Sequence, residues 1–98
     1  MALSVSQKKQ LRRMAHHLKP VVIIGHKGLS STFLAAVEEG LGRHELLKVR
    51  LGGVERAERD RITASVIEAT GAERVQRIGF TLTLYRRNAE NPKITLGD

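Results

Sequence analysis

The segment from Pro20 to Gly28 constrains the fold more than any other part of the chain. Proline disfavours a helical conformation at the residue before it, so a helix that precedes Pro20 must end there. Residues 21–24 (VVII) are all apolar and β-branched, which is typical of a buried strand and predicts a central position in a sheet. Gly25 and Gly28 then break the strand, and Ser30 is a suitable N-cap for a second helix. The chain therefore begins helix, strand, helix.

Hydrophobic periodicity extends this order to the end of the chain. The apolar residues Leu11, Met14, Ala15 and Leu18 recur at helical spacing, whereas alternation marks the later strands. We expect helices at 5–18, 31–42 and 55–70, and strands at 21–24, 45–51, 74–78 and 81–86. This order, α-β-α-β-α-β-β, predicts a single compact α/β domain over residues 1–87. Its four-stranded mixed sheet should have right-handed crossovers and helices mainly on one face.

The strand at 45–51 is predicted to have one apolar and one basic face. Leu47, Val49 and Leu51 point one way, and Lys48 and Arg50 point the other. If the last strand lies nearby, Thr81, Thr83 and Tyr85 would share the basic face, Tyr85 could stack on a base, and Arg86 and Arg87 could contact phosphate. Residues 88–98 contain Asn91-Pro92 and few apolar side chains, so we expect a loosely ordered tail.

The charge of the chain is unevenly distributed. Lys and Arg number 17 against 10 Asp and Glu, which gives a net charge of +7. The first carboxylate is Glu38, and six cations precede it: Lys8, Lys9, Arg12, Arg13, Lys19 and Lys27. A basic region without carboxylates is the electrostatic pattern expected of a nucleic-acid-binding protein. The same charge suits an adaptor that docks on an acidic protein surface, and this alternative stays open. A membrane partner is not expected, because the basic helix lacks a bulky aromatic face.

The bend Gly25-His26-Lys27-Gly28 joins a strand to a helix N-terminus. Helix N-termini present unpaired N–H groups to phosphates, and G-x-x-G loops clamp nucleic-acid backbones in KH domains. We expect Gly25 and Gly28 to let the backbone approach a phosphate and Lys27 to add a point charge. His26 could stack or donate a hydrogen bond. The alternative interpretation is a tight turn that uses glycine for its dihedral freedom.

Neither catalysis nor a cofactor is expected. The chain has no cysteine, and its four histidines, His16, His17, His26 and His44, lack the partners that a metal or acid–base site requires. We expect His16 and His17 to face phosphate at a helix end. P-loop and Rossmann glycine motifs are absent. The absence of cysteine and of a signal peptide predicts a cytoplasmic protein, and we expect a monomer.

Several motifs together resemble a known family. They are residues 18–25 (LKPVVIIG), Gly28-Leu29, residues 44–49 (HELLKV), Ile78-Gly79 and residues 84–86 (LYR). In this order they resemble the YhbY-type CRM domain, an RNA-binding module, over about residues 3–87. The resemblance implies a fold like that of the C-terminal domain of translation initiation factor three. It also implies an RNA contact at Gly25–Gly28, and association with the ribosomal RNA of large-subunit precursors during ribosome assembly.

The sequence analysis therefore predicts an RNA-binding protein that uses shape and charge. Two residues depart from the family pattern: Phe80 replaces a basic residue, and Arg77 replaces an apolar one, so the RNA contact near the last hairpin is either lost or moved to Arg77. The residues predicted to bind RNA are Lys8, Lys9, Arg12, Arg13, Lys19, Gly25, His26, Lys27, Gly28, Lys48, Arg50 and Arg86.

Overall fold

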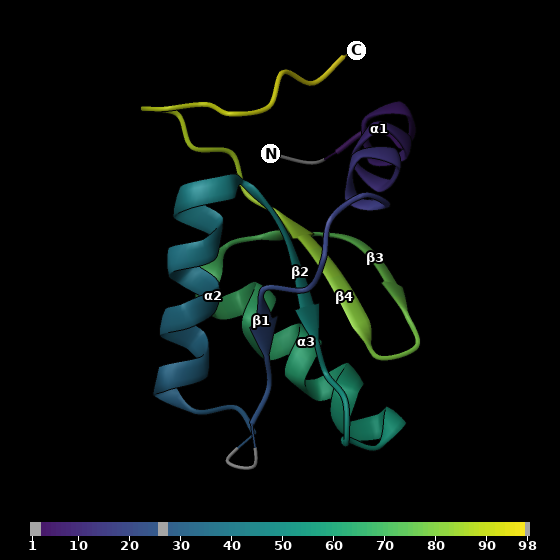
Figure 1. Cartoon of the computed structure of the whole chain (residues 1–98), viewed down its shortest axis with the longest axis vertical. Coiled ribbons are helices and arrows are strands. Elements are labelled where there is room, and N and C mark those ends of the chain that lie inside the picture. The colour runs from purple at the N-terminus through teal and green to yellow at the C-terminus, as the bar shows by residue number, and fades with distance from the viewer. Residues whose placement is uncertain (1–2, 26–27, 98) are drawn as a thin grey trace.

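The computed structural model describes residues 3–25 and 28–97. It contains three helices and four strands in the predicted order (Figure 1). The helices are α1 (Val5–Ala15), α2 (Ser31–His44) and α3 (Arg56–Thr70), and the strands are β1 (Val22–Ile23), β2 (Leu46–Arg50), β3 (Glu73–Ile78) and β4 (Thr81–Tyr85). The predicted α/β class and the mixed four-stranded sheet are confirmed.

The sheet has the strand order β1-β2-β4-β3. β1 runs parallel to β2, and β4 lies antiparallel to both β2 and β3. The expected central position of the 21–24 strand is wrong, because β1 pairs only with β2 and forms an edge. Val22 and Ile24 are buried, but Val21 and Ile23 are 62% and 65% exposed.

The three helices cover the two faces of the sheet unequally (Figure 1). α2 and α3 pack on one face, where Phe33, Val37 and Val66 join the apolar side chains of β2 and β4 in the main core. α1 packs on the opposite face and covers only one end of it. Leu11 and Ala15 of α1 there contact Leu46, Val75 and Tyr85 in a second, smaller core.

Local side chains explain where the helices begin. Ser4 and Gln7 form a capping box at the start of α1, and Ser30 accepts a hydrogen bond from the backbone N–H of Phe33 at the start of α2. α1 ends at Ala15, three residues before the predicted end. α2 continues past Gly42 to His44. Gly40 fits inside α2 because a Cβ there would lie 2.8 Å from Cδ1 of Leu47, so the glycine permits close contact between helix and sheet.

The C-terminal segment, which the sequence predicts to be loosely ordered, makes specific contacts in the structure. Residues 88–97 form neither helix nor strand, yet they lie along α1 and the end of α2. The backbone N–H groups of Asn88, Lys93 and Ile94 donate to the buried carboxylate of Glu45. Ile94 and Leu96 also pack against the smaller core. Composition alone could not reveal these contacts, because their partners lie more than 40 residues away in the sequence.

Candidate nucleic-acid interface

α1 covers one end of its sheet face and leaves the rest uncovered (Figure 1). Beyond the end that it covers, a row of neighbouring residues crosses all four strands: Ile23, Arg50, Thr81 and Ile78. A second row, closer to α1, contains Lys48, Thr83 and Gln76. We call these two rows the open sheet surface, although Thr83, in the middle of the second row, is buried beneath its neighbours. It combines two cations with exposed aliphatic side chains.

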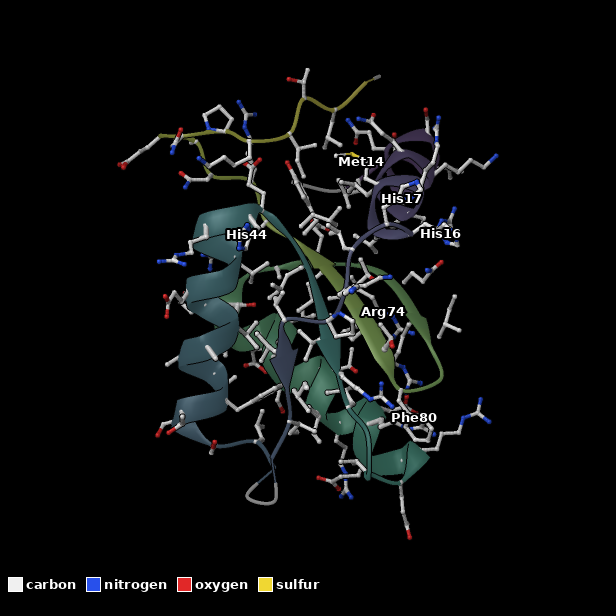
Figure 2. All side chains as sticks on the ribbon, in the orientation of Figure 1. Met14, His16, His17, His44, Arg74 and Phe80 are labelled. Atoms are coloured by element: carbon white, nitrogen blue, oxygen red, sulfur yellow. The ribbon has the colours of Figure 1, made fainter. Side chains whose placement is uncertain are left out.

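Arg12, in the last turn of α1, adds positive charge at the border of this surface. Arg12 and His16 are one helical turn apart, and they line a shallow hollow of about 250 Å³ together with Lys48. Its other lining residues are Gln76, Ile78, Thr81 and Thr83, so no carboxylate lines it among the described residues. Figure 2 shows His16 at the end of α1 on the side of β3.

Lys19 and Lys48 border a second hollow of about 310 Å³, between α1 and the end of α2. Its walls are mostly apolar, from Met14, Leu18, Val21 and Leu46 among others, and again no described carboxylate lines it. The Lys48 ammonium donates to the carbonyl of Leu18 at 3.1 Å, which fixes the α1–β1 linker against β2. The structure therefore brings Arg12, Lys19, Lys48 and Arg50 to one side of the molecule.

The other predicted cations of α1 continue this side. Lys8 is half-buried one turn before Arg12, whereas Lys9 and Arg13 are exposed. No acidic residue occurs in the first turn of α1. Arg12 and Arg13 occupy its last turn, where positive charge interacts favourably with the negative end of the helix dipole.

The glycine-flanked bend does not lie beside these cations. The β1–α2 connection is at the lower end of Figure 1, and α1 is at the upper end. The cations of α1 and the bend therefore do not form one continuous site. The two are separated because β1 runs away from α1 before the chain turns. His26 and Lys27 lie outside the described residues.

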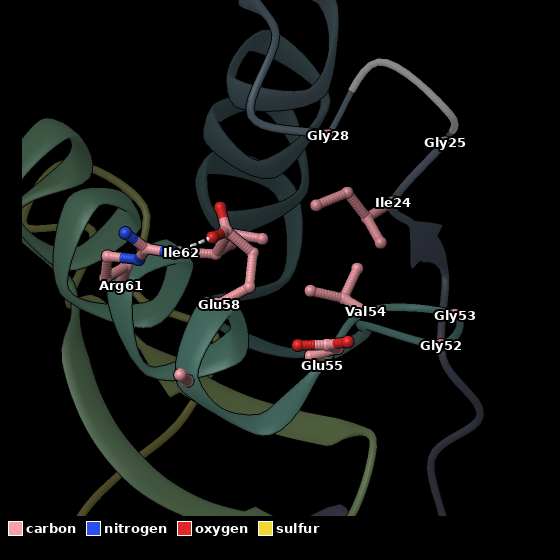
Figure 3. Close-up of a pocket in the computed structure, with 11 residues that line it drawn as sticks. Ile24, Gly25, Gly28, Gly52, Gly53, Val54, Glu55, Glu58, Arg61 and Ile62 are labelled. Carbon is pink, nitrogen blue, oxygen red and sulfur yellow. Dashed lines mark hydrogen bonds and ion pairs between the residues drawn. The ribbon is translucent and has the colours of Figure 1, made fainter.

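Gly25 and Gly28 instead border a hollow of about 690 Å³ against the start of α3 (Figure 3). Glu55, Glu58 and Arg61 line it, and because Glu58 pairs with Arg61, only the carboxylate of Glu55 is left to oppose the approach of a phosphate. The N–H of Gly28, which has a φ of 63°, donates to the carbonyl of Gly25 at 3.0 Å, so this amide is already occupied. The described part of the bend has the hydrogen bonding of a tight turn.

Two residues predicted for the basic sheet face have internal roles. Tyr85 is 2% exposed beneath α1, so it cannot stack on a base. Burial raises its pKa, and the negative charge of Glu45 adds to the rise. Arg86 forms an ion pair with Glu38 of α2 and donates to the carbonyl of Thr70 at 2.9 Å, so it ties β4 to both helices. The residue pattern of the strand could not show that α1 covers this end of the sheet.

Two residues of the last hairpin, Arg77 and Phe80, contact side chains of α3. Arg77 is paired with Asp60 and its side chain is 13% exposed. The ring of Phe80 lies 4.5 Å from the guanidinium carbon of Arg59. Sequence reasoning did not select Arg56 or Arg59, because alternating charges along a helix resemble an ordinary solvated face.

The described residues include no group of His, Asp and Glu side chains that could hold a metal ion. Within 3–25 and 28–97, no helix is long and apolar enough to cross a membrane.

Comparisons with a family model, with known proteins and with a solved structure agree with one another. The model of the CRS1/YhbY (CRM) domain matches residues 3–86. An RNA-binding protein of Haemophilus influenzae is 43% identical over 88 residues, which cover 90% of this chain and 89% of that protein. A protein of Pseudomonas aeruginosa named as a probable RNA-binding protein is 40% identical over 95% of this chain and 89% of that protein. Another so named, from Bacillus subtilis, is 32% identical over 96% of this chain and 98% of that protein. A solution structure from Staphylococcus aureus, described as a candidate RNA-binding protein, superimposes with a TM-score of 0.81 at 31% identity over 98% of this chain and all of that one.

Proposed function

Because the chain belongs to the CRS1/YhbY (CRM) domain family, we propose that it binds RNA through the open sheet surface and the adjoining side of α1. One observation supports the location: Arg12, Lys19 and Lys48 line two adjoining hollows that no described carboxylate lines, and Arg50 lies on the same face of β2 as Lys48. Such a concentration of cations attracts the phosphate backbone and gives affinity without a specific sequence.

The chemistry of this surface suits a structured RNA more than a particular base sequence. Arg50 and Lys48 provide charge, and Ile23 and Ile78 provide apolar contact for sugars or unstacked bases. No aromatic ring is exposed among the described residues of the open sheet surface, so recognition by stacking platforms, as in RRM domains, is not part of this mechanism. We expect binding that depends on RNA shape and falls steeply with salt.

We further propose that the RNA is ribosomal RNA of large-subunit precursors, and that the chain acts on it as a cytoplasmic monomer during ribosome assembly. The motif resemblance supports this assignment. Crosslinking in cells, followed by sequencing of the attached RNA, tests it directly. Recovery of precursor large-subunit RNA is the expected result, and recovery of unrelated RNAs would overturn this part of the proposal.

We propose the loop from Gly25 to Gly28 as a second RNA contact, separate from the one at α1. The molecule is 38 Å long, and an RNA that reaches both α1 and the loop must follow this axis. A short RNA would therefore contact one of the two regions, and a longer RNA could contact both.

Salt-titrated filter binding with charge-removing variants tests the location. Arg12→Gln and Lys48→Gln should each weaken binding of different RNA sequences to a similar extent and reduce the slope of log K against log salt by about 1. The control is Arg43→Gln, an equal loss of charge at an exposed α2 residue that pairs with Glu39. Equal affinities for all three variants would contradict the proposed surface.

A ribonuclease control separates RNA binding from the adaptor alternative. Protein partners recovered with the intact chain should disappear after nuclease treatment if RNA links them. Partners that resist nuclease but are lost with Arg12→Gln would favour docking on an acidic protein surface.

A further inference from the structure

Three arginines surround a hollow of about 270 Å³ beside the β3–β4 turn. Arg56 and Arg59 come from the start of α3, Arg77 comes from β3, and Gly79 completes the lining. We call this site the arginine hollow. It lies on the α3 side of the hairpin, and Phe80, labelled in Figure 2, occupies the turn next to it.

Two guanidinium groups of this site have buried donors without acceptors. The Nε atoms of Arg59 and Arg77 are both buried, and neither has a hydrogen-bond partner in the described part of the chain. Other nitrogens of the same side chains are engaged: Arg59 donates to the carbonyl of Gly79 at 2.9 Å, and Arg77 pairs with Asp60. Buried N–H groups are nearly always satisfied, so two such donors on residues that line the same hollow point to an acceptor that the described residues do not supply.

The charge balance specifies an anionic acceptor. Three guanidinium groups line the arginine hollow, and the carboxylate of Asp60 offsets only one of them. The side chain of Arg56 has no hydrogen bond or ion pair with the described residues, so its five donors are available. Planar guanidinium groups match the oxygens of a phosphate in paired hydrogen bonds, which makes a phosphate the best-fitting anion.

Phe80 supplies a surface for the base next to such a phosphate. Its side chain is 48% exposed, and the guanidinium of Arg59 covers part of the ring at 4.5 Å from the centroid. The backbone of the turn is fixed, because the carbonyl of Phe80 accepts from the N–H of Leu51 at 2.6 Å. An exposed and positioned ring beside a cation is a suitable stacking partner for an unpaired base.

We propose that the arginine hollow binds a backbone phosphate of single-stranded RNA and that Phe80 stacks on the adjacent base. The inference rests on the proposed RNA-binding function and extends it around the hairpin. Ile78 and Thr81 line the open sheet surface, whereas Arg77 and Gly79 line the arginine hollow. A strand that leaves the open sheet surface therefore meets this site as it passes the β3–β4 turn.

Binding of single-stranded RNA to Arg56→Gln tests the phosphate contact. Arg56 is exposed and free of described partners, so its loss should leave the melting temperature unchanged. We expect weaker binding and a slope of log K against log salt that is less steep by about 1. Arg43→Gln removes the same charge from α2 and should retain wild-type binding.

Phe80→Leu tests the base contact, because leucine keeps apolar contact with Arg59 but removes the ring. Affinity for single-stranded RNA should fall about tenfold, the usual size of a base–ring contact. Affinity for fully paired RNA should not change.

Nitrogen-labelled arginine side chains report on the hollow independently of affinity. The Nε–H resonances of Arg59 and Arg77 should shift when single-stranded RNA is added. A shift with inorganic phosphate or adenosine monophosphate, but not with RNA, would assign the hollow to small anions and overturn the proposal.

Two negative outcomes are distinguishable. If RNA binds and both Arg56→Gln and Phe80→Leu behave as Arg43→Gln does, with unmoved Nε–H resonances, this inference fails and the proposed function stands. If the wild-type chain binds no RNA even at low salt, both fail.

Discussion

At the scale of single residues, Glu45 stands out because its backbone and its side chain have opposite preferences. It is the one described residue other than glycine with a positive φ, 63°, a conformation that favours glycine. The side chain compensates, because its buried carboxylate accepts three backbone N–H groups of the C-terminal segment. A glycine would relax the backbone but leave those three donors without an acceptor.

Glu45→Gln should therefore destabilise the protein by about 2 kcal/mol. One carboxylate oxygen accepts from Lys93 and Ile94, and the other accepts from Asn88, so the amide group of glutamine must face at least one N–H donor. Urea denaturation at neutral pH measures the loss. The control is Glu90→Gln, which removes an exposed carboxylate of the same segment.

The stabilisation by Glu45 also depends on pH. Burial raises the pKa of this carboxyl, but the three backbone hydrogen bonds and Arg87 outweigh burial and hold the pKa below its ordinary value. A lowered pKa in the folded state gives stability that is present above the pKa of the unfolded chain, about 4.3. This stability is lost as pH falls through the lowered folded value. Wild-type and Glu45→Gln stabilities should therefore converge in acid, and a constant difference between them would contradict this assignment.

At the scale of elements, α1 and the C-terminal segment form one structural unit. Gln7 and Gln10 of α1 donate to the carbonyls of Gly97 and Thr95, and Gln10 accepts from the N–H of Gly97. α1 alone buries only a narrow stripe, since Leu11 and Ala15 are its only buried residues in the described chain. The segment from 88 to 97 completes the packing on this side.

Removal of residues 88–98 should cost about 3 kcal/mol, because the three hydrogen bonds to Glu45 and the apolar contacts of Ile94 and Leu96 are lost together. Thermal and urea denaturation measure the change. Lys93→Ala is the matched control, because Lys93 contributes its backbone N–H and its exposed side chain has no partner in the described structure. An unchanged midpoint after truncation would show that the segment does not stabilise the fold.

Local patterns in the sequence were sufficient for the order and class of the elements. The two faces of β2 were predicted correctly from the alternation of Leu47, Val49 and Leu51 with Lys48 and Arg50. The prediction that the first helix ends before Pro20 is also confirmed. The edge position of β1 was missed because an apolar run reports burial and not the number of neighbouring strands. The tail was missed because its partner, Glu45, is distant in sequence.

The candidate site was predictable where charge is local in sequence. Arg12, Lys19, Lys48 and Arg50 were selected from runs and alternation, and they lie on one side of the molecule. Tyr85 and Arg86 were selected by the same reasoning, yet they serve the packing of α1, α2 and α3. Arg56, Arg59 and Arg77 meet only through the α3–hairpin contact, which no short sequence window contains.

At the scale of the whole molecule, the two ends of the 38 Å axis differ in charge. α1 carries Lys8, Lys9, Arg12 and Arg13 and no acidic residue in its first turn at one end, whereas the hollow at the β1–α2 bend combines Glu55 and Glu58 with Arg61 at the other. A polyanion should therefore approach the α1 end first and meet the open sheet surface. The difference in charge between the two ends predicts how bound RNA is oriented along the long axis of the molecule, and this orientation can be measured.

Amide chemical-shift mapping with RNA at low and at physiological salt tests the central claim most directly. Our account predicts that the largest salt-sensitive shifts occur in α1, in the linker that contains Lys19 and along β2 at Lys48 and Arg50. The outward side of α2 should stay unchanged. Shifts confined to α2, or no shifts in α1 and β2 while RNA is bound, would contradict the claim that this surface is where the chain binds RNA.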